Sequence, residues 1–133
     1  MTERGRAGEQ NLTGIWNGLY TYPNGRSTSF VATLIDSGGS LSGTTHEPGS
    51  LGGTLYASLV GSRNESAVGF TKTYDRPSLF HRKPIIYEGT LNGDATEIEG
   101  RWTIQKVWSG KFMMVRSGGQ AAKVERKAVE RVR

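Results

Sequence analysis

Three charged residues occupy positions where the surrounding pattern predicts an inward-facing side chain: Glu47, Lys72 and Arg116. Each lies at the end of an expected strand or within a few residues of it, so all three could gather at one mouth of a closed sheet. A charge removed from water is costly unless it is paired or bound. The arrangement predicts a polar recognition site in which Lys72 or Arg116 faces an anionic or carbonyl group of a ligand.

Aromatic residues share these inward positions and would supply most of the area in contact with a ligand. Thr45 lies two residues before Glu47 on the same face and belongs to the same predicted site. The expected aromatic walls are Tyr20, Phe70, Tyr74, Tyr87 and Trp102.

A second interpretation of the same residues involves no ligand. Glu47 and Lys72 would then be rim residues in water, and Arg116 would close the barrel against a backbone carbonyl group. The two interpretations differ in which residues of each strand face inward, which we call the strand parity. This parity shifts by one residue at any β-bulge.

The chain shows no pattern typical of catalysis or metal binding. Its only histidines are His46 and His81, and a pair of His81 with Asp75 would lack an accompanying nucleophile motif. There is no cysteine, no His-x-His and no acidic loop, so we expect no metal and no cofactor. Haem ligation would depend on His81 alone.

The elements that must position these residues are short runs of alternating apolar and polar residues, separated by turn signals such as Pro23-Asn24-Gly25 and Asn92-Gly93-Asp94. Evenly spaced strands joined by hairpins predict an antiparallel sandwich or barrel with up-and-down topology. The expected strands are 14–22, 27–36, 40–47, 54–62, 67–74, 85–92, 97–106 and 110–116. The longer connection 75–84 is either a lid over one barrel end or a solvated loop.

Glycine favours the barrel over the sandwich. The chain has 19 glycines, and several stand alone within expected strands, among them Gly43, Gly61, Gly89 and Gly100. Such glycines relieve crowding where a sheet coils into a small barrel. The predicted fold is therefore all-β, an eight-stranded antiparallel up-and-down β-barrel followed by a short C-terminal helix.

The expected organisation is a flexible N-terminus over residues 1–11, a barrel domain over 12–117 and a basic helix or tail over 118–133. In the last segment Val124, Ala128 and Val132 form an apolar stripe beside charged residues. This pattern is typical of a terminal helix packed over a barrel end or a neighbouring subunit, and less typical of a membrane-binding or nucleic-acid-binding segment. The polar start of the chain predicts neither a signal peptide nor a membrane span, so we expect a cytoplasmic protein.

The segment Leu12-Thr13-Gly14-Ile15-Trp16 resembles the Leu-Thr-Gly-x-Trp opening of avidin and streptavidin. Its Gly-x-Trp core is also similar to the start of other calycins, including lipocalins, fatty-acid-binding proteins and nitrobindins. Three later segments resemble the third, fifth and seventh strands of avidins: Ser40-Leu41-Ser42-Gly43-Thr44, Val68-Gly69-Phe70-Thr71 and Arg101-Trp102. The resemblance implies a calycin-like, avidin-like barrel.

The resemblance does not imply biotin as the ligand. The resemblance to avidins would place an asparagine at Gly18, a tyrosine at Thr45 and a serine at Glu47. Tyr74 replaces a tryptophan, and Trp102 alone matches the biotin-binding set. Further departures are Lys83 and Ile85, which replace a hydroxyl pair. Haem binding of the nitrobindin type would need a histidine on the inner face, where none is expected.

These observations lead to three functional hypotheses. The first is a non-enzymatic binding protein for a small, partly apolar and possibly anionic ligand in the barrel mouth. The second is an interaction module with a packed barrel that acts through its outer face or basic tail. The third is an isomerase or cyclase that would use an inward acid–base pair. Nucleic acid is not an expected partner, whereas a homo-oligomer could form through Val31, Thr33 and Ile35.

Overall fold

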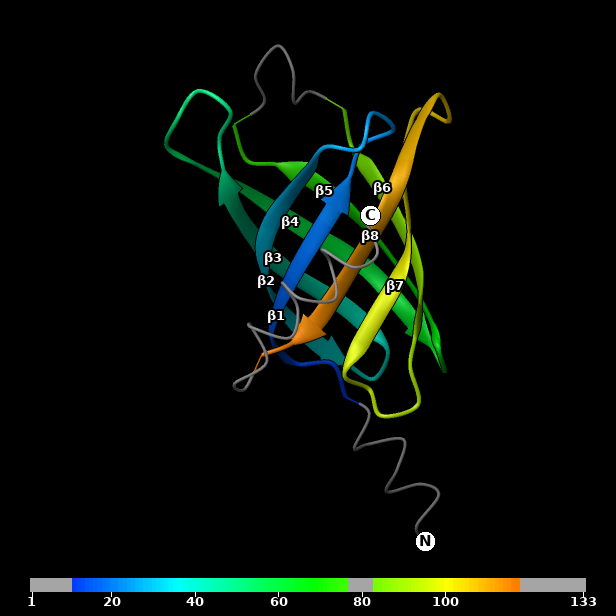
Figure 1. Cartoon of the computed structure of the whole chain (residues 1–133). Coiled ribbons are helices and arrows are strands. Elements are labelled where there is room, and N and C mark those ends of the chain that lie inside the picture. Colours follow the sequence, from blue (N-terminus) through cyan, green and yellow to red (C-terminus); the bar gives the residue numbers. More distant parts are fainter. Residues whose placement is uncertain (1–10, 77–82, 118–133) are drawn as a thin grey trace, which may run out of the picture.

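The first and last strands of the chain pair with each other and close the sheet into a barrel (Figure 1). The structure is a computed structural model that describes residues 11–76 and 83–117. Every strand runs antiparallel to both neighbours, so the predicted eight-stranded up-and-down barrel is confirmed. The strands are β1 (Gly14–Thr21), β2 (Ser27–Ser37), β3 (Ser40–Pro48), β4 (Thr54–Asn64), β5 (Ala67–Tyr74), β6 (Ile85–Leu91), β7 (Glu97–Ile104) and β8 (Trp108–Arg116).

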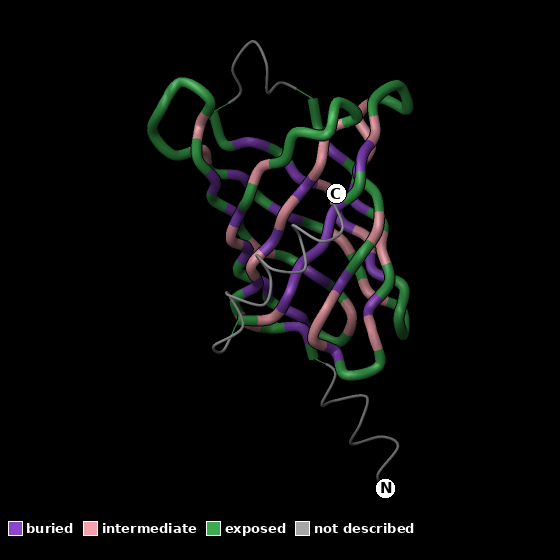
Figure 2. The backbone as a smooth tube through the Cα atoms, viewed as in Figure 1, coloured by how far each residue is buried: buried purple, intermediate pink, exposed green. Residues whose placement is uncertain are grey.

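Buried and exposed residues alternate along the strands, as Figure 2 shows. The inward face of β1 carries Trp16, Gly18 and Tyr20, and this agrees with the predicted parity. Strand β2, whose parity is ambiguous in the sequence, buries the Phe30 face and exposes the Ile35 face. The interior is therefore a packed apolar core that shares its space with the polar residues described below.

Glycines in the strands permit the close approach of neighbouring strands. Gly89 of β6 and Gly100 of β7 are register partners. A Cβ atom added to Gly100 would collide with the backbone carbonyl oxygen of Glu88, and one added to Gly61 would collide with that of Gly69. Side chains at these positions would push strands apart, which explains why glycine recurs in a tightly coiled barrel.

The up-and-down order separates the connections into two sets. The β1–β2, β3–β4, β5–β6 and β7–β8 connections lie at one end, the mouth, at the top of Figure 1. The other connections and residues 11–13 lie at the opposite end, which we call the closed end. Residues 77–82 of the predicted lid or loop lie outside the described residues, as does the predicted C-terminal helix at 118–133.

The β7–β8 turn differs from its predicted position. The sequence predicts strands to Lys106 and from Gly110, whereas β7 ends at Ile104 and β8 begins at Trp108. Gln105 and Lys106 both have positive φ angles, 53° and 62°, and form the centre of the turn. The connection is the three residues 105–107, and the Val107 N–H donates to the Ile104 carbonyl oxygen at 3.0 Å. Two successive residues with positive φ match the twist of the paired strands, and here they occur without the usual asparagine or glycine.

Strand β8 is buried on both faces near its end. Phe112 and Met114 point into the barrel, whereas Met113 and Val115 point outward and are nevertheless buried, with Leu19 of β1 packed against them. Among residues 11–76 and 83–117, no helix has the length and apolar character that a membrane crossing requires.

Candidate functional site

A buried ion pair lies on the inner face of the barrel near the mouth. Glu47 ends the inward row of β3, and Lys72 lies near the end of β5. The Nζ atom of Lys72 is 2.5 Å from Oε1 of Glu47, and the two residues are only 1% and 3% exposed. The alternative in which both are solvated rim residues is therefore wrong. The free-energy cost of removing the two charges from water is offset by their mutual attraction and by the hydrogen bonds around them.

Two tyrosines complete the polar cluster. The hydroxyl groups of Tyr20 and Tyr74 donate hydrogen bonds to Oε2 of Glu47, at 2.5 and 3.0 Å. Burial is the main cause that raises the pKa of both phenols, and the nearby Glu47 carboxylate adds to it. Both hydroxyl groups therefore keep their protons and act as donors to Glu47. We call Tyr20, Glu47 and Tyr74 the polar floor.

Aromatic rings surround the Lys72 ammonium group. Its Nζ atom lies 4.9 Å from the ring centre of Tyr20 and 4.8 Å from that of Tyr74, with Phe30 and Tyr87 slightly farther away. Burial lowers the pKa of Lys72, and the attraction of Glu47 opposes this effect. The ring faces and the carboxylate together compensate for lost hydration of the cation.

The mouth opens into a cavity of about 510 Å³ above the polar floor. This volume is in the range of small-molecule sites, which are mostly apolar with a few polar groups. Of the residues predicted to bind a ligand, Tyr20, Glu47, Tyr74, Tyr87 and Trp102 line this cavity. The other lining residues are Tyr22, Thr28, Pro48, Ser50, Leu55, Lys83, Ile85, Ile104 and Trp108.

The aromatic side of the cavity is held in place by edge-to-face contacts. Trp102 lies 6.4 Å from Tyr20 and 5.9 Å from Tyr22, measured between ring centres, and its indole N–H donates to the backbone oxygen of Thr21. Tyr87 stacks on Phe70 at 5.1 Å deeper in the barrel. These contacts fix the rings before any ligand arrives, which lowers the entropic cost of binding.

Four residues of the predicted site do not line the cavity: Thr45, Phe70, Lys72 and Arg116. Phe70 lies beneath Tyr87, and Lys72 lies behind the carboxylate of Glu47. Thr45 lies one inward position deeper on β3, where its hydroxyl oxygen is buried without a hydrogen-bond partner.

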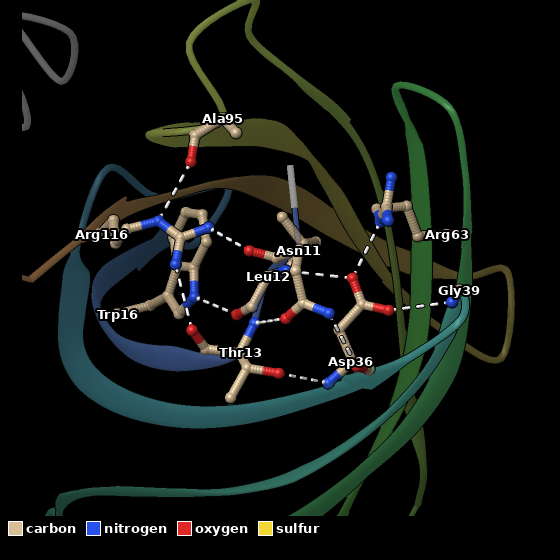
Figure 3. Close-up of polar contacts among 9 residues, drawn as sticks. All are labelled: Asn11, Leu12, Thr13, Trp16, Asp36, Gly39, Arg63, Ala95 and Arg116. Atoms are coloured by element: carbon tan, nitrogen blue, oxygen red, sulfur yellow. Dashed lines mark hydrogen bonds and ion pairs between the residues drawn. The ribbon is translucent and has the colours of Figure 1, made fainter. Parts of the chain in front are cut away.

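Arg116 lies at the closed end, so the expectation that it joins Glu47 and Lys72 at one mouth is wrong. Strand direction alternates in an up-and-down barrel, so β3 and β5 end at the mouth and β8 ends at the opposite end. The Arg116 guanidinium lies 4.7 Å from the ring centre of Trp16. It donates hydrogen bonds to the backbone oxygens of Asn11, Thr13 and Ala95 (Figure 3). The alternative in which Arg116 closes the barrel is therefore correct.

A second polar network completes the closed end. The Asp36 carboxylate accepts hydrogen bonds from the backbone N–H groups of Leu12 and Gly39 and pairs with Arg63 at 3.0 Å (Figure 3). Leu12 in turn accepts a hydrogen bond from the Trp16 indole. All these groups bind other parts of the protein, so this end is a structural plug.

Tyr22 is the main site residue that the sequence analysis missed. It lies two residues after Tyr20 and therefore on the same face, so parity alone could have identified it. Trp108 was missed because the β7–β8 turn was placed two residues too late. Ile104 shares the inward parity of Trp102, so parity alone could have identified it as well. Lys83 adds an exposed cation at the rim.

In the part of the chain that the structure describes, histidine and acidic residues do not gather into a metal site. His46 is exposed on the outer face as predicted, and its ring lies 6.3 Å from that of Tyr56. Within residues 11–76 and 83–117, no three histidine or acidic side chains are grouped so that they could hold a metal ion.

No family model matches the chain, and no curated protein matches its sequence. Several solved structures that resemble this fold are designed barrels. A redesigned β-barrel, b11L5F_LGL, aligns with a TM-score of 0.70 and 18% identity over 85% of this chain and 96% of its own. EF1p2_mFAP2b bound to DFHBI aligns with a TM-score of 0.67 and 15% identity over 84% and 98%. mFAP1 bound to DFHBI aligns with a TM-score of 0.65 and 14% identity over 84% and 99%. At these identities the likeness shows the fold alone.

Proposed function

We propose that this protein is a non-enzymatic binder of a small, partly apolar molecule, held in the barrel mouth. The observation that carries the proposal is a cavity of about 510 Å³ whose walls are aromatic and aliphatic and whose floor is a buried polar cluster. Such a combination is typical of ligand sites. Two designed barrels of this fold have structures bound to DFHBI, which supports the idea that a barrel of this size can hold a small ligand.

The charges around the cavity favour a ligand that is neutral at its inner end. Lys72 is matched by Glu47 and does not line the cavity, and Arg116 lies at the other end of the barrel. The remaining cation among the described lining residues is Lys83 at the rim. An acidic group on the ligand would therefore be placed at the rim, beside Lys83.

A calycin-like origin is part of this proposal. The Gly14–Trp16 segment that resembles calycins opens β1, and Trp16 plugs the closed end under Arg116. That plug leaves the mouth as the natural entrance for a ligand.

An enzymatic role of the isomerase type has less support. An acid–base catalyst needs a group that exchanges protons with a substrate. Glu47 already accepts three hydrogen bonds from Lys72, Tyr20 and Tyr74.

Thermal unfolding with aromatic probes tests the proposal, because a ligand that binds the folded state raises the melting temperature. We would use 2-naphthol, 2-naphthoate and 2-methoxynaphthalene. Thr28→Trp places a large ring in the cavity and should abolish stabilisation by any probe that binds. Thr90→Trp, on an exposed outward position of β6, is the matched control and should leave it intact. The proposal fails if no probe stabilises the wild type, or if Thr28→Trp binds as well as Thr90→Trp.

A further inference from the structure

The hydrogen bonds of the polar floor determine which groups it can offer to a ligand. A tyrosine hydroxyl has one proton to donate, and those of Tyr20 and Tyr74 are both directed to Oε2 of Glu47. An ionised carboxylate has no proton and about four acceptor sites, of which Lys72 and the two tyrosines use three. The floor therefore faces the cavity mainly with acceptor oxygens.

One contact at the floor is weak enough for a ligand to replace. The Tyr22 hydroxyl lies 3.5 Å from the Tyr20 oxygen, longer than the usual O–H···O distance of about 2.7–2.8 Å. A ligand donor that reaches the Tyr20 oxygen would form a shorter bond. It would also leave the Tyr22 hydroxyl able to donate to the ligand.

Charged groups fit this floor less well. A ligand carboxylate would bring its negative charge beside the Glu47 carboxylate, and the two charges would repel each other. The Glu47 charge is already paired with the Lys72 ammonium group. An ammonium group would approach rings of Tyr20 and Tyr74 that already face the Lys72 cation at 4.9 and 4.8 Å.

We infer that the ligand carries a neutral hydrogen-bond donor, a hydroxyl or N–H group, at the end of its apolar body that enters the barrel. This inference rests on the proposed function and names the chemistry of its ligand. The donor binds the oxygens of Tyr20 and Glu47, and the apolar body lies against Trp102 and Ile85.

Dissociation constants of the naphthalene probes, measured by quenching of tryptophan fluorescence, test the inference. 2-Naphthol has a donor and 2-methoxynaphthalene does not, and we expect 2-naphthol to bind about tenfold more tightly, the effect of one hydrogen bond to a charged cluster. Tyr20→Phe removes one of the two acceptor oxygens and should lower this ratio, while Glu47 keeps its own acceptor sites. Tyr56→Phe, the same change on the exposed outer face, should leave the ratio unchanged.

The outcomes separate the inference from the proposed function. Equal affinities of 2-naphthol and 2-methoxynaphthalene in the wild type, or tightest binding of 2-naphthoate, would overturn the donor inference while the mouth remains a ligand site. Binding of none of the probes would overturn the proposed function itself. An unchanged ratio in Tyr20→Phe would also overturn the assignment of the donor to this floor.

The outer surface of the barrel carries charged residues on some strands and none on others. The outward positions of β2, β3, β4 and β5 contain no aspartate, glutamate, lysine or arginine. The outward positions of β6, β7 and β8 in contrast include Glu88, Glu99, Arg101 and Lys111. We call the outward residues of β2 to β5 the uncharged face.

Apolar side chains are exposed on this face. Ile35, Tyr56 and Val60 are 53%, 58% and 66% exposed. The strand registers place residues of the face in rows that cross the sheet. One row runs Ile35, Ser42, Val60, Thr71 and then Ile86 of β6, and the next runs Thr33, Thr44, Ser58 and Thr73.

We propose that the uncharged face binds a second copy of this chain. In a two-fold symmetric dimer, residues near the axis meet their own copies, so any charge there would face a like charge. The chain carries a net charge of +5, and contact through a face without charge keeps like charges of the two copies apart. A barrel has no free strand edge, so contact must be face to face.

The size of the face sets the expected strength of the dimer. Strands of eight to eleven residues, at about 3.3 Å per residue and about 4.8 Å between strands, give an area of about 30 Å by 15 Å. Two such faces bury about 900 Å² in total, which is below the roughly 1,200 Å² of stable interfaces and within the range of weak, transient ones. We therefore expect a weak dimer that dissociates on dilution.

Sedimentation equilibrium over a range of concentrations tests this second proposal. The wild type should show masses that rise from 14.5 kDa towards twice that value. Val60→Lys should raise the dissociation constant about tenfold or more, because like charges meet across the axis. Val107→Lys, the same change at an exposed position in the β7–β8 turn, should leave it unchanged. A wild type that stays monomeric, or equal effects of the two variants, would overturn the proposal.

Discussion

The ammonium group of Lys72 lies 2.5 Å from the carboxylate of Glu47 in the interior of a barrel that is otherwise mostly apolar. The two residues belong to β5 and β3, which are separated by β4, so the pair spans the inner surface rather than joining neighbouring strands. Tyr20 and Tyr74 bind the same carboxylate. The base of the mouth is therefore a single hydrogen-bonded unit whose members depend on one another.

A double-mutant cycle at this pair should show strong coupling. Lys72→Met leaves the Glu47 carboxylate buried without its cation, and we expect a loss of about 3–5 kcal/mol in the free energy of unfolding. Glu47→Gln combined with Lys72→Met removes both charges, while the amide oxygen can still accept from Tyr20. The double variant should be more stable than Lys72→Met alone. Urea unfolding of the four proteins measures the coupling, and additive effects would contradict a buried pair.

Replacement of Arg116 by lysine should destabilise the barrel without affecting the mouth. Arg116 donates to three backbone oxygens and lies over Trp16, and a lysine cannot reproduce this planar set of contacts. We expect a loss of about 1–3 kcal/mol in urea unfolding. Arg101→Lys is the matched control, because Arg101 is exposed and bonds only to Ser109 among the contacts described. A loss equal to that of the control would contradict the role of Arg116 in the plug.

Much of the fold could be predicted from the sequence because each strand alternates apolar and polar residues. Trp102 faces inward because Ile98, Gly100 and Trp102 share one parity. The β7–β8 turn could not be placed, because Gln105 and Lys106 adopt positive φ angles that nothing in their residue types indicates.

The candidate site was predictable in composition and less so in arrangement. Parity identified Glu47 and Lys72 as inward residues, although their direct pairing depends on the barrel register. The error at Arg116 arose because parity tells which face a residue occupies and not which end of the barrel. Strand direction supplies that information, since β8 ends opposite to β3 and β5. The uncharged face was only partly anticipated from Val31, Thr33 and Ile35.

Gly100→Ala should destabilise the barrel strongly. A Cβ atom at this position would collide with backbone atoms of Glu88 and Gly89 in β6, which cannot move without breaking the β6–β7 pairing. We expect a loss of about 1–3 kcal/mol or more. Gly93→Ala, in the β6–β7 connection, is the control because no atom lies within 4 Å of its added Cβ. Thermal unfolding of both variants gives the comparison, and equal melting temperatures would contradict the close approach of the two strands.

Asp36 should make the stability of the closed end depend on pH. Burial alone would raise the pKa of Asp36, but hydrogen bonds from Leu12 and Gly39 and the ion pair with Arg63 outweigh it and lower the pKa below the ordinary value of 3.8. Because the folded state binds this proton less tightly than the unfolded state, the stabilisation is present above the ordinary pKa. It is lost as the pH falls through the lowered value.

The variant Asp36→Asn tests this dependence. At neutral pH it should lose about 1–3 kcal/mol relative to the wild type, because the amide cannot pair with Arg63 and accepts fewer hydrogen bonds. Melting temperatures of the two proteins should begin to converge below about pH 4, where the unfolded chain gains the proton, and should come together as the pH falls through the lowered pKa of folded Asp36. Asp94→Asn, in an exposed turn, should follow the wild type throughout. A constant difference between Asp36→Asn and the wild type from neutral to acidic pH would show that the Asp36 charge does not stabilise the plug.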